Sequence, residues 1–190
     1  MTEQEIKDHL KKTLKKKRYQ HTIGVAETAK KLAEHYGEDS DRAYLAGLLH
    51  DCAKNVPKEE RIALAESYGC ELSSVEKRQT GLIHAKLGAA MAKKDFGVED
   101  EEILSAIRCH TVGRPGMTLL EEIIFVADYI EPNREGLPHL DQLREKAYTD
   151  LDACVVDMLE NTFFFIAEGH GEVDEQGLDT YLYYSEKVKA

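Results

Sequence analysis

The amino-acid sequence predicts an all-α fold, because three of its properties agree. Apolar residues recur with a period close to 3.6 along almost the whole chain, and no strand-like alternation persists. Only 4 prolines and 13 glycines occur in 190 residues, and 42% of the residues are hydrophobic, which is typical of a helical globular protein. No repeat, low-complexity linker or shift in composition divides the chain. We therefore expect one domain over residues 1–190, a length that supports one hydrophobic core.

The first four helices are predicted from their apolar stripes and from the residues that end them. The first three stripes consist of Ile6, Leu10 and Leu14, of Ile23, Ala26, Ala29, Ala33 and Tyr36, and of Ala43, Ala46, Leu49 and His50. Gly37 can stop the second helix in a left-handed conformation, and Asp39 or Ser40 can cap the third. Pro57 ends the third run and can open a fourth helix, which holds Ile62.

The rest of the chain continues the helical period between glycines. Helices are expected at about residues 73–80, 84–96, 100–110, 119–130 and 140–168, with a last one at 179–188. The last segment contains Tyr181, Tyr183 and Tyr184, and a tyrosine stripe of this kind is more typical of core or dimer packing than of a ligand site.

Composition and charge argue against several functional classes. The formal net charge of −11 disfavours a nucleic-acid partner, in spite of a basic stretch at residues 11–18. No run approaches the roughly 20 apolar residues of a membrane span, and the polar start does not resemble a signal peptide. We therefore expect a cytoplasmic protein without a membrane partner. The 4 cysteines include no C-x-x-C pair, which argues against a disulfide framework or a structural zinc site.

Six polar residues stand out because each lies at or near the end of an apolar helical segment. They are His21, the adjacent pair His50 and Asp51, His84, His110 and Asp128. Asp128 is the hardest of them to explain otherwise, since it interrupts an apolar run in which a buried carboxylate is costly unless it is paired or binds a metal. The remaining four histidines lack this context and are interpreted as ordinary surface or packing residues: His9, His35, His139 and His170.

These residue types at these positions predict a centre that binds two cations. Neighbours within a helix project about 100° apart, but His50 and Asp51 end a helical run, where both can address one cation. Imidazole and carboxylate together suit iron, manganese, cobalt, nickel or zinc. The other four residues would complete two sites bridged by Asp51, one with His21 and Asp128 and the other with His84 and His110. Two cations about 3.5–4 Å apart would activate a water for attack on a phosphate ester or anhydride.

The segments around these residues resemble a known family. The first histidine, the His-Asp pair and the later aspartate resemble the H…HD…D pattern of the HD-domain metal-dependent phosphohydrolases. Five segments in order carry a closer resemblance: RYQHTIGV from Arg18, HDCAK from His50, HAKLGA from His84, HTVGR from His110 and DYIEPNR from Asp128. Over residues 18–134 they are similar to the YqeK family of symmetrical diadenosine tetraphosphate hydrolases.

The resemblance implies a fold, a reaction and roles for the site residues. Members are compact HD-domain helical bundles, usually homodimers, with iron, one or two ions, in the site (manganese, cobalt, nickel or zinc being substitutes). They cleave diadenosine tetraphosphate symmetrically to two ADP with a metal-activated hydroxide. The implied metal ligands are His21, His50, Asp51, His84, His110 and Asp128. The implied catalytic residues are Asp51, Lys54 and Arg134.

The expected substrate contacts surround the same cluster. Lys54 is a point charge one turn past His50, and Arg134 can bind phosphate oxygens bidentately. Arg18, three residues before a proposed ligand, can also point at a phosphate, and Tyr181 can stack on adenine. The full expected set is Arg18, His21, Lys54, His84, His110, Thr111, Asp128, Arg134 and Tyr181.

Two alternatives of different kinds stay open at this point. One is an HD phosphohydrolase that acts on another nucleotide, namely a dNTP, a nucleoside monophosphate or a cyclic nucleotide. The branch that acts on cyclic dinucleotides is disfavoured, because the run H-H-E-x-x-D-G-x-x-Y-P is absent. The other is a nucleotide-sensing protein that binds without turnover. It would require a broken metal set, and all six ligands are present.

Overall fold

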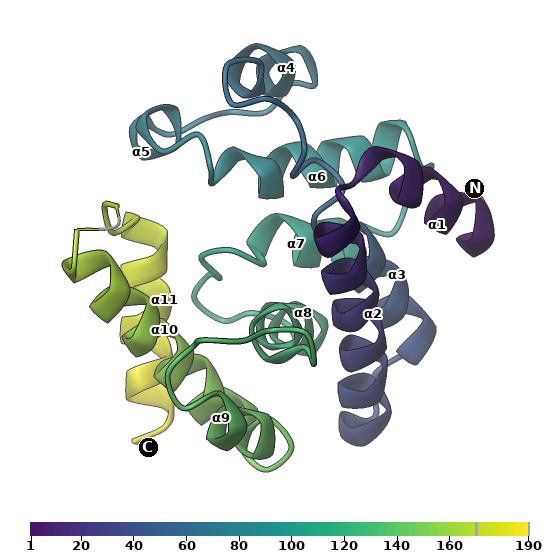
Figure 1. Ribbon diagram of the computed structural model, residues 1–190. Coiled ribbons are helices and arrows are strands. Elements are labelled where there is room, and N and C mark those ends of the chain that lie inside the picture. The colour runs from purple at the N-terminus through teal and green to yellow at the C-terminus, as the bar shows by residue number, and fades with distance from the viewer. Residues whose placement is uncertain (170, 190) are drawn as a thin grey trace.

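The computed structural model describes residues 1–169 and 171–189. Over these residues it contains eleven helices and no strand, which confirms the all-α prediction (Figure 1). None of the described helices is both long and apolar enough to cross a membrane. His170 and Ala190, the latter being the last residue of the predicted domain, lie outside the described residues.

The helices cover most of the described chain. In order they are α1 (Glu3–Thr13), α2 (Lys16–Tyr36), α3 (Ser40–Leu49), α4 (Arg61–Ser67), α5 (Ser74–Arg78), α6 (Ile83–Lys94), α7 (Glu101–Cys109), α8 (Leu119–Ile130), α9 (Leu140–Lys146), α10 (Leu151–Ala167) and α11 (Glu175–Lys187).

Helix α8 is the centre of the fold, and α2, α3, α7 and α10 all pack against it (Figure 1). Thr118 starts this helix with a capping box: its hydroxyl accepts a hydrogen bond from the Glu121 N–H, and its own N–H donates to the Glu121 carboxylate at 2.8 Å. The helix then buries the apolar residues Leu120, Ile123, Ile124, Phe125, Val126 and Ala127. The polar residues at its far end therefore lie where the most buried helix of the fold stops.

Helices α2 and α3 pack closely against each other and bring two predicted ligands together. Gly37 ends α2 in the left-handed conformation with φ 77°, and the Asp39 side chain caps α3, so both predicted signals are confirmed. Gly47 in α3 lies so close to α2 that a Cβ there would be 2.8 Å from the Cα of Ala26. A larger residue at Gly47 would force the two helices apart.

Two predicted helix boundaries are wrong, although the helix that holds Ile62 is present as α4. In both regions a residue that favours a turn or a helix start is the cause. Pro57 does not open a helix. It begins a turn closed by a hydrogen bond from the Glu60 N–H to the Pro57 carbonyl oxygen at 3.0 Å, and α4 starts only at Arg61. The single helix expected over residues 140–168 is broken, because Asp150 caps a new helix, α10, with its side chain. Asp174 likewise caps α11, which starts earlier than expected.

Candidate metal centre

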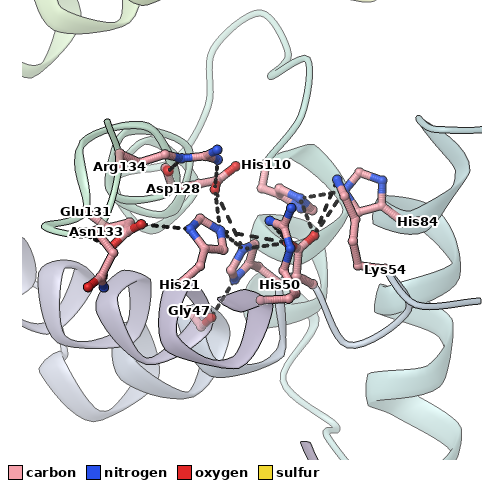
Figure 2. A network of polar contacts seen from close by, with 12 residues as sticks. His21, Gly47, His50, Lys54, His84, His110, Asp128, Glu131, Asn133 and Arg134 are labelled. Carbon is pink, nitrogen blue, oxygen red and sulfur yellow. Dashed lines mark hydrogen bonds and ion pairs between the residues drawn. The ribbon is translucent and has the colours of Figure 1, made fainter. Parts of the chain in front are cut away.

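All six residues of the predicted cluster meet at one place, and each reaches it from near a helix end. His21 lies in the second turn of α2, His50 and Asp51 follow α3, His84 is in the first turn of α6, His110 follows α7, and Asp128 is in the last turn of α8. Figure 2 shows the four histidines and Asp128 pointing toward one another. The four histidines and Asp51 are buried, with at most 6% of each residue exposed. Five helices thus converge on one buried polar centre.

Asp51 lies between two sets of histidines. Its Oδ2 is 3.8 Å from His21 Nε2 and 3.5 Å from His50 Nε2. Its Oδ1 is 3.2 Å from His84 Nε2 and 3.8 Å from His110 Nε2. One carboxylate oxygen therefore faces each pair, as expected of a residue that bridges two cations.

Asp128 joins the first of these sets. Its Oδ1 is 3.0 Å from His21 Nε2 and 3.7 Å from His50 Nε2. Three overlapping groups of potential ligand atoms result, and within each group all atoms lie within 4.8 Å of one another. They are His21 with His50 and Asp51, His50 with His110 and Asp128, and Asp51 with His84 and His110.

The histidine rings are oriented so that Nε2 faces the centre. Nδ1 of His50, His84 and His110 lies 2.6, 2.5 and 2.7 Å from the carbonyl oxygen of the residue three positions earlier. A carbonyl oxygen only accepts hydrogen bonds, so Nδ1 carries a proton in each ring and Nε2 is the atom offered to the cluster. The Nε2 atoms of His84 and His110 are only 3.1 Å apart, and two facing lone pairs repel. The Lys54 ammonium donates to His84 Nε2 at 3.0 Å, and a metal ion that both nitrogens contact would relieve the repulsion at both.

A second feature also favours a cation in the cluster. Asp51 Oδ1 is buried and has no hydrogen-bond partner among the described residues, and leaving a buried charged acceptor unsatisfied is costly. A cation that contacts this oxygen and the Nε2 atoms of His84 and His110 would remove both penalties. Nitrogen and carboxylate donors in this combination fit a divalent transition metal.

The pKa directions describe the charge of the metal-free cluster. Burial, together with His84 and His50, lowers the pKa of His110 to about 3, and burial lowers the pKa of His84. For His50, burial lowers the pKa, but Asp51 and Asp128 raise it more, so the net direction is upward. Burial raises the pKa of both carboxyls, yet the histidines around them hold it well below its usual range. The carboxylates are therefore charged, and a cation that binds must displace any proton on His50.

Three basic side chains lie at the edge of the cluster, and all three were expected to bind phosphate. Arg18 Nη1 is 2.7 Å from Asp51 Oδ2, and Arg134 Nη2 is 2.8 Å from Asp128 Oδ1. Lys54 Nζ is 3.0 Å from His84 Nε2 (Figure 2). Each side chain is about one third exposed (29%, 33% and 31%), so each can reach both the cluster and a bound anion.

Cavities open onto the cluster at two ends. At the His84 end, a cavity of about 270 Å³ has a partly apolar wall that includes Lys54, His84, Thr111, Tyr129 and Met158. At the His21 end, a polar cavity of about 410 Å³ is lined by Lys17, Arg18, Gln20, His21, Asn133 and Arg134, among others. A third cavity, of about 390 Å³, shares Leu82 and Thr111 with the first. An elongated ligand can therefore lie across the cluster with its ends in different cavities.

Tyr181 is the one expected substrate contact that the structure does not bring to the cluster. Its hydroxyl donates to Glu160 Oε1 at 2.9 Å, and its ring packs edge-on against Phe163 with the centroids 5.6 Å apart.

Glu131, by contrast, had no expected role, but its Oε1 lies 3.0 Å from His21 Nδ1 (Figure 2). The sequence held one signal for it, a glutamate at the end of the same apolar helix that carries Asp128.

Comparison with known proteins agrees with this geometry. The family model of the HD domain matches residues 18–133, a range that contains all six cluster residues. The chain belongs to the HD domain family. This HD-domain protein is 43% identical over 187 residues to the symmetrical bis(5'-nucleosyl)-tetraphosphatase of Bacillus subtilis (strain 168), with 97% of each chain covered. It is 44% identical over 174 residues to the protein of the same name from Halalkalibacterium halodurans, with 90% of this chain and 91% of the relative covered.

A solved structure is also similar over almost the whole chain. The crystal structure of a predicted HD superfamily hydrolase involved in NAD metabolism, from Clostridium acetobutylicum, superposes on this HD-domain protein with a TM-score of 0.94. The two chains are 40% identical, and 98% of each is covered. The HD domain and the buried His/Asp cluster together indicate a site for a divalent metal.

Proposed function

We propose that this chain is a metal-dependent hydrolase that cleaves diadenosine tetraphosphate, and related dinucleoside polyphosphates, symmetrically to two ADP. The observation that carries the proposal is the 43% identity to a symmetrical tetraphosphatase over 97% of both chains. The cluster supports it, because six converging nitrogen and oxygen ligands suit hydrolysis of a phosphoanhydride.

We propose that His21, His50, Asp51, His84, His110 and Asp128 hold iron, as one or two ions that manganese, cobalt, nickel or zinc can replace. When bound, the metal would polarise phosphate oxygens and lower the pKa of a water molecule. Asp51 is assigned the bridging role because its two oxygens face different histidine pairs.

The basic side chains are assigned to the phosphates. Lys54 at the His84 end, together with Arg18 and Arg134 at the His21 end, can bind a polyphosphate on both sides of the cluster. Negative charge develops on the phosphate oxygens in the transition state. These oxygens would lie between the three basic side chains, whose fixed positive charges would stabilise that transition state. Thr111 lines the cavity next to His110 and can donate its hydroxyl to a phosphate oxygen. Tyr181 is left out of this assignment because it does not line the cavities at the two ends of the cluster.

A cytoplasmic homodimer is proposed on the family resemblance alone. Sedimentation of the purified chain would test the dimer. A monomer at micromolar concentration would remove that part of the proposal without affecting the site.

The deciding experiment is product analysis across a panel of nucleotides. The metal-loaded protein should release two ADP from diadenosine tetraphosphate, and hydrolysis in ¹⁸O-labelled water should place one label on one of the two products. Release of inorganic phosphate or triphosphate from mononucleotides would instead favour another HD phosphohydrolase. Tight binding without turnover would favour a nucleotide sensor.

A further inference from the structure

We propose that Glu131 is a positioning residue that fixes the orientation and proton of His21 and strengthens metal binding at that end of the cluster. Three of the four cluster histidines direct Nδ1 to a backbone carbonyl oxygen. His21 alone directs Nδ1 to a carboxylate, Glu131 Oε1, at 3.0 Å. Glu131 is only 1% exposed, so this charged group is buried directly behind a proposed ligand.

The other oxygen of Glu131 is also fully used. Oε2 accepts hydrogen bonds from the Asn133 backbone N–H at 2.6 Å and from its side-chain Nδ2 at 2.9 Å. Asn133 Nδ2 also reaches the carbonyl oxygen of Gln20 at 3.4 Å, on the same helix as His21. The carboxylate is therefore held from both sides and has one orientation available.

Arg144 on α9 holds the turn that carries Glu131. Its guanidinium donates to the carbonyl oxygens of Ile130, Glu131 and Arg134 at 3.0, 3.0 and 3.2 Å. These carbonyls lie at and just after the end of α8, where backbone acceptors lack helical partners. The turn is thus fixed by a residue outside the cluster. The same turn carries Arg134, whose Nη2 donates a hydrogen bond to Asp128 Oδ1.

Gly24 on α2 makes room for the carboxylate. A Cβ at this position would lie 2.3 Å from Glu131 Oε2 and 2.9 Å from Asn133 Nδ2. Glycine in a helix interior costs roughly 1 kcal/mol relative to alanine. The close approach of Glu131 is therefore a physical reason for glycine at position 24.

The consequence for the cluster follows from this geometry. Glu131 accepts the Nδ1 proton of His21, so Nε2 is left facing Asp128 Oδ1 at 3.0 Å. A carboxylate behind a metal-binding imidazole makes the ring a stronger ligand, and removing such a supporting group weakens metal binding by about 10- to 100-fold. The inference rests on the metal-ligand role proposed above for His21 and is independent of the substrate.

The primary test is Glu131→Gln. Both oxygens of Glu131 accept hydrogen bonds, and an amide can accept on one side only. The variant should bind Mn²⁺ about 10- to 100-fold more weakly in competition with a chelating dye. In the Zn²⁺-loaded protein, the ¹H–¹⁵N signal of the His21 Nδ1 proton should move upfield, while the His50 Nδ1 signal stays in place. Glu122→Gln is the matched control: Glu122 lies on α8, the helix that Glu131 follows, and accepts a hydrogen bond from the Tyr184 hydroxyl. This variant should bind Mn²⁺ like the parent.

Gly24→Ala provides a second, independent test. Alanine favours the helix, yet its methyl group must displace the Glu131 carboxylate, so Mn²⁺ affinity should fall while the helical circular dichroism is retained. Parent-like Mn²⁺ affinity in both Glu131→Gln and Gly24→Ala, with weakened binding in Asp128→Asn, would overturn the role of Glu131 and leave the metal site standing. Unchanged affinity in Asp128→Asn as well would refute the ligand assignment itself.

Discussion

The two ends of the cluster use the same ligand types but differ in the balance of charge around them. We call His21, His50 and Asp128 the Asp128 half, and His84 and His110 the Lys54 half; Asp51 belongs to both. The Asp128 half contains the Asp128 carboxylate and has Glu131 behind it. The Lys54 half contains no carboxylate except the shared Asp51, and the ammonium group of Lys54 lies 3.0 Å from His84 Nε2 (Figure 2).

This difference predicts that the two halves differ in cation affinity although their ligand types are the same. Two unit charges about 4 Å apart interact by about 4 kcal/mol when the effective dielectric constant is about 20. Around the Asp128 half, the three carboxylates of Asp51, Asp128 and Glu131 outnumber the two guanidinium groups of Arg18 and Arg134, so an entering cation is attracted. Around the Lys54 half, the single shared carboxylate of Asp51 faces the ammonium group of Lys54. We therefore expect the first cation to bind in the Asp128 half. The Lys54 half then receives either a second cation or a phosphate group held by Lys54.

The largest effect is expected from Asp51→Ala, which removes the residue that the two halves share. Both halves should lose a ligand, so bound metal measured by mass spectrometry should fall to background. Turnover of diadenosine tetraphosphate should drop by at least about 1000-fold, the equivalent of roughly 4 kcal/mol of transition-state stabilisation. Asp41→Ala removes an aspartate whose side chain is 94% exposed and should change neither quantity. An active, metal-free Asp51→Ala protein would refute the metal centre.

A smaller effect that separates the halves is expected from Lys54→Met. The change keeps most of the side-chain length and removes the charge beside His84. Turnover should fall by roughly 100-fold, the usual size of a lost charge-stabilising group. Calorimetric titration with Mn²⁺ should at the same time show tighter binding of the second ion and unchanged binding of the first. Lys187→Met, at a lysine paired with Asp152, is the control. If Lys54→Met leaves turnover unchanged, the phosphate role of Lys54 is wrong.

The sequence was sufficient to predict the six cluster residues because each depends on a local pattern. His50 follows the last residue of a helix, His110 does the same in α7, and Asp128 interrupts the most apolar helix of the chain. Such positions can be recognised from periodicity and helix ends. The order of the helices then brings them together, and α8 at the centre of the fold gives them one meeting point.

The residues that support the cluster could not be predicted in this way. Glu131 acts on a histidine 110 positions away, and Arg144 acts on the carbonyl oxygens of a turn rather than on a side chain. Arg144 leaves no pattern in the local sequence, and the one signal for Glu131 is its position at the end of the apolar helix that carries Asp128. The break between α9 and α10 was missed for a different reason: Asp150 is a single capping residue inside a long segment with helical periodicity, and the periodicity on both sides of it outweighed that signal.

The smallest effect concerns a buried carboxylate outside the cluster, Glu122, and its pH dependence should be opposite in sign to that of Asp51 and Asp128. Burial raises the pKa of Glu122, in spite of the hydrogen bond that the Tyr184 hydroxyl donates to it at 2.5 Å. A raised pKa in the folded state means that the stabilising contribution is complete below the unfolded value, near 4.5, and is lost as the pH rises through the folded value. For Asp51 and Asp128, whose pKa is lowered, stability is instead lost as the pH falls.

Urea unfolding of the metal-free protein between pH 4 and pH 7 tests this difference. As the pH rises, the free energy of unfolding of Glu122→Gln should increase relative to that of the parent, by on the order of 1 kcal/mol. If the difference in free energy of unfolding between variant and parent does not change with pH, Glu122 does not titrate in this range. The proposed contrast between Glu122 and the two cluster aspartates would then be wrong.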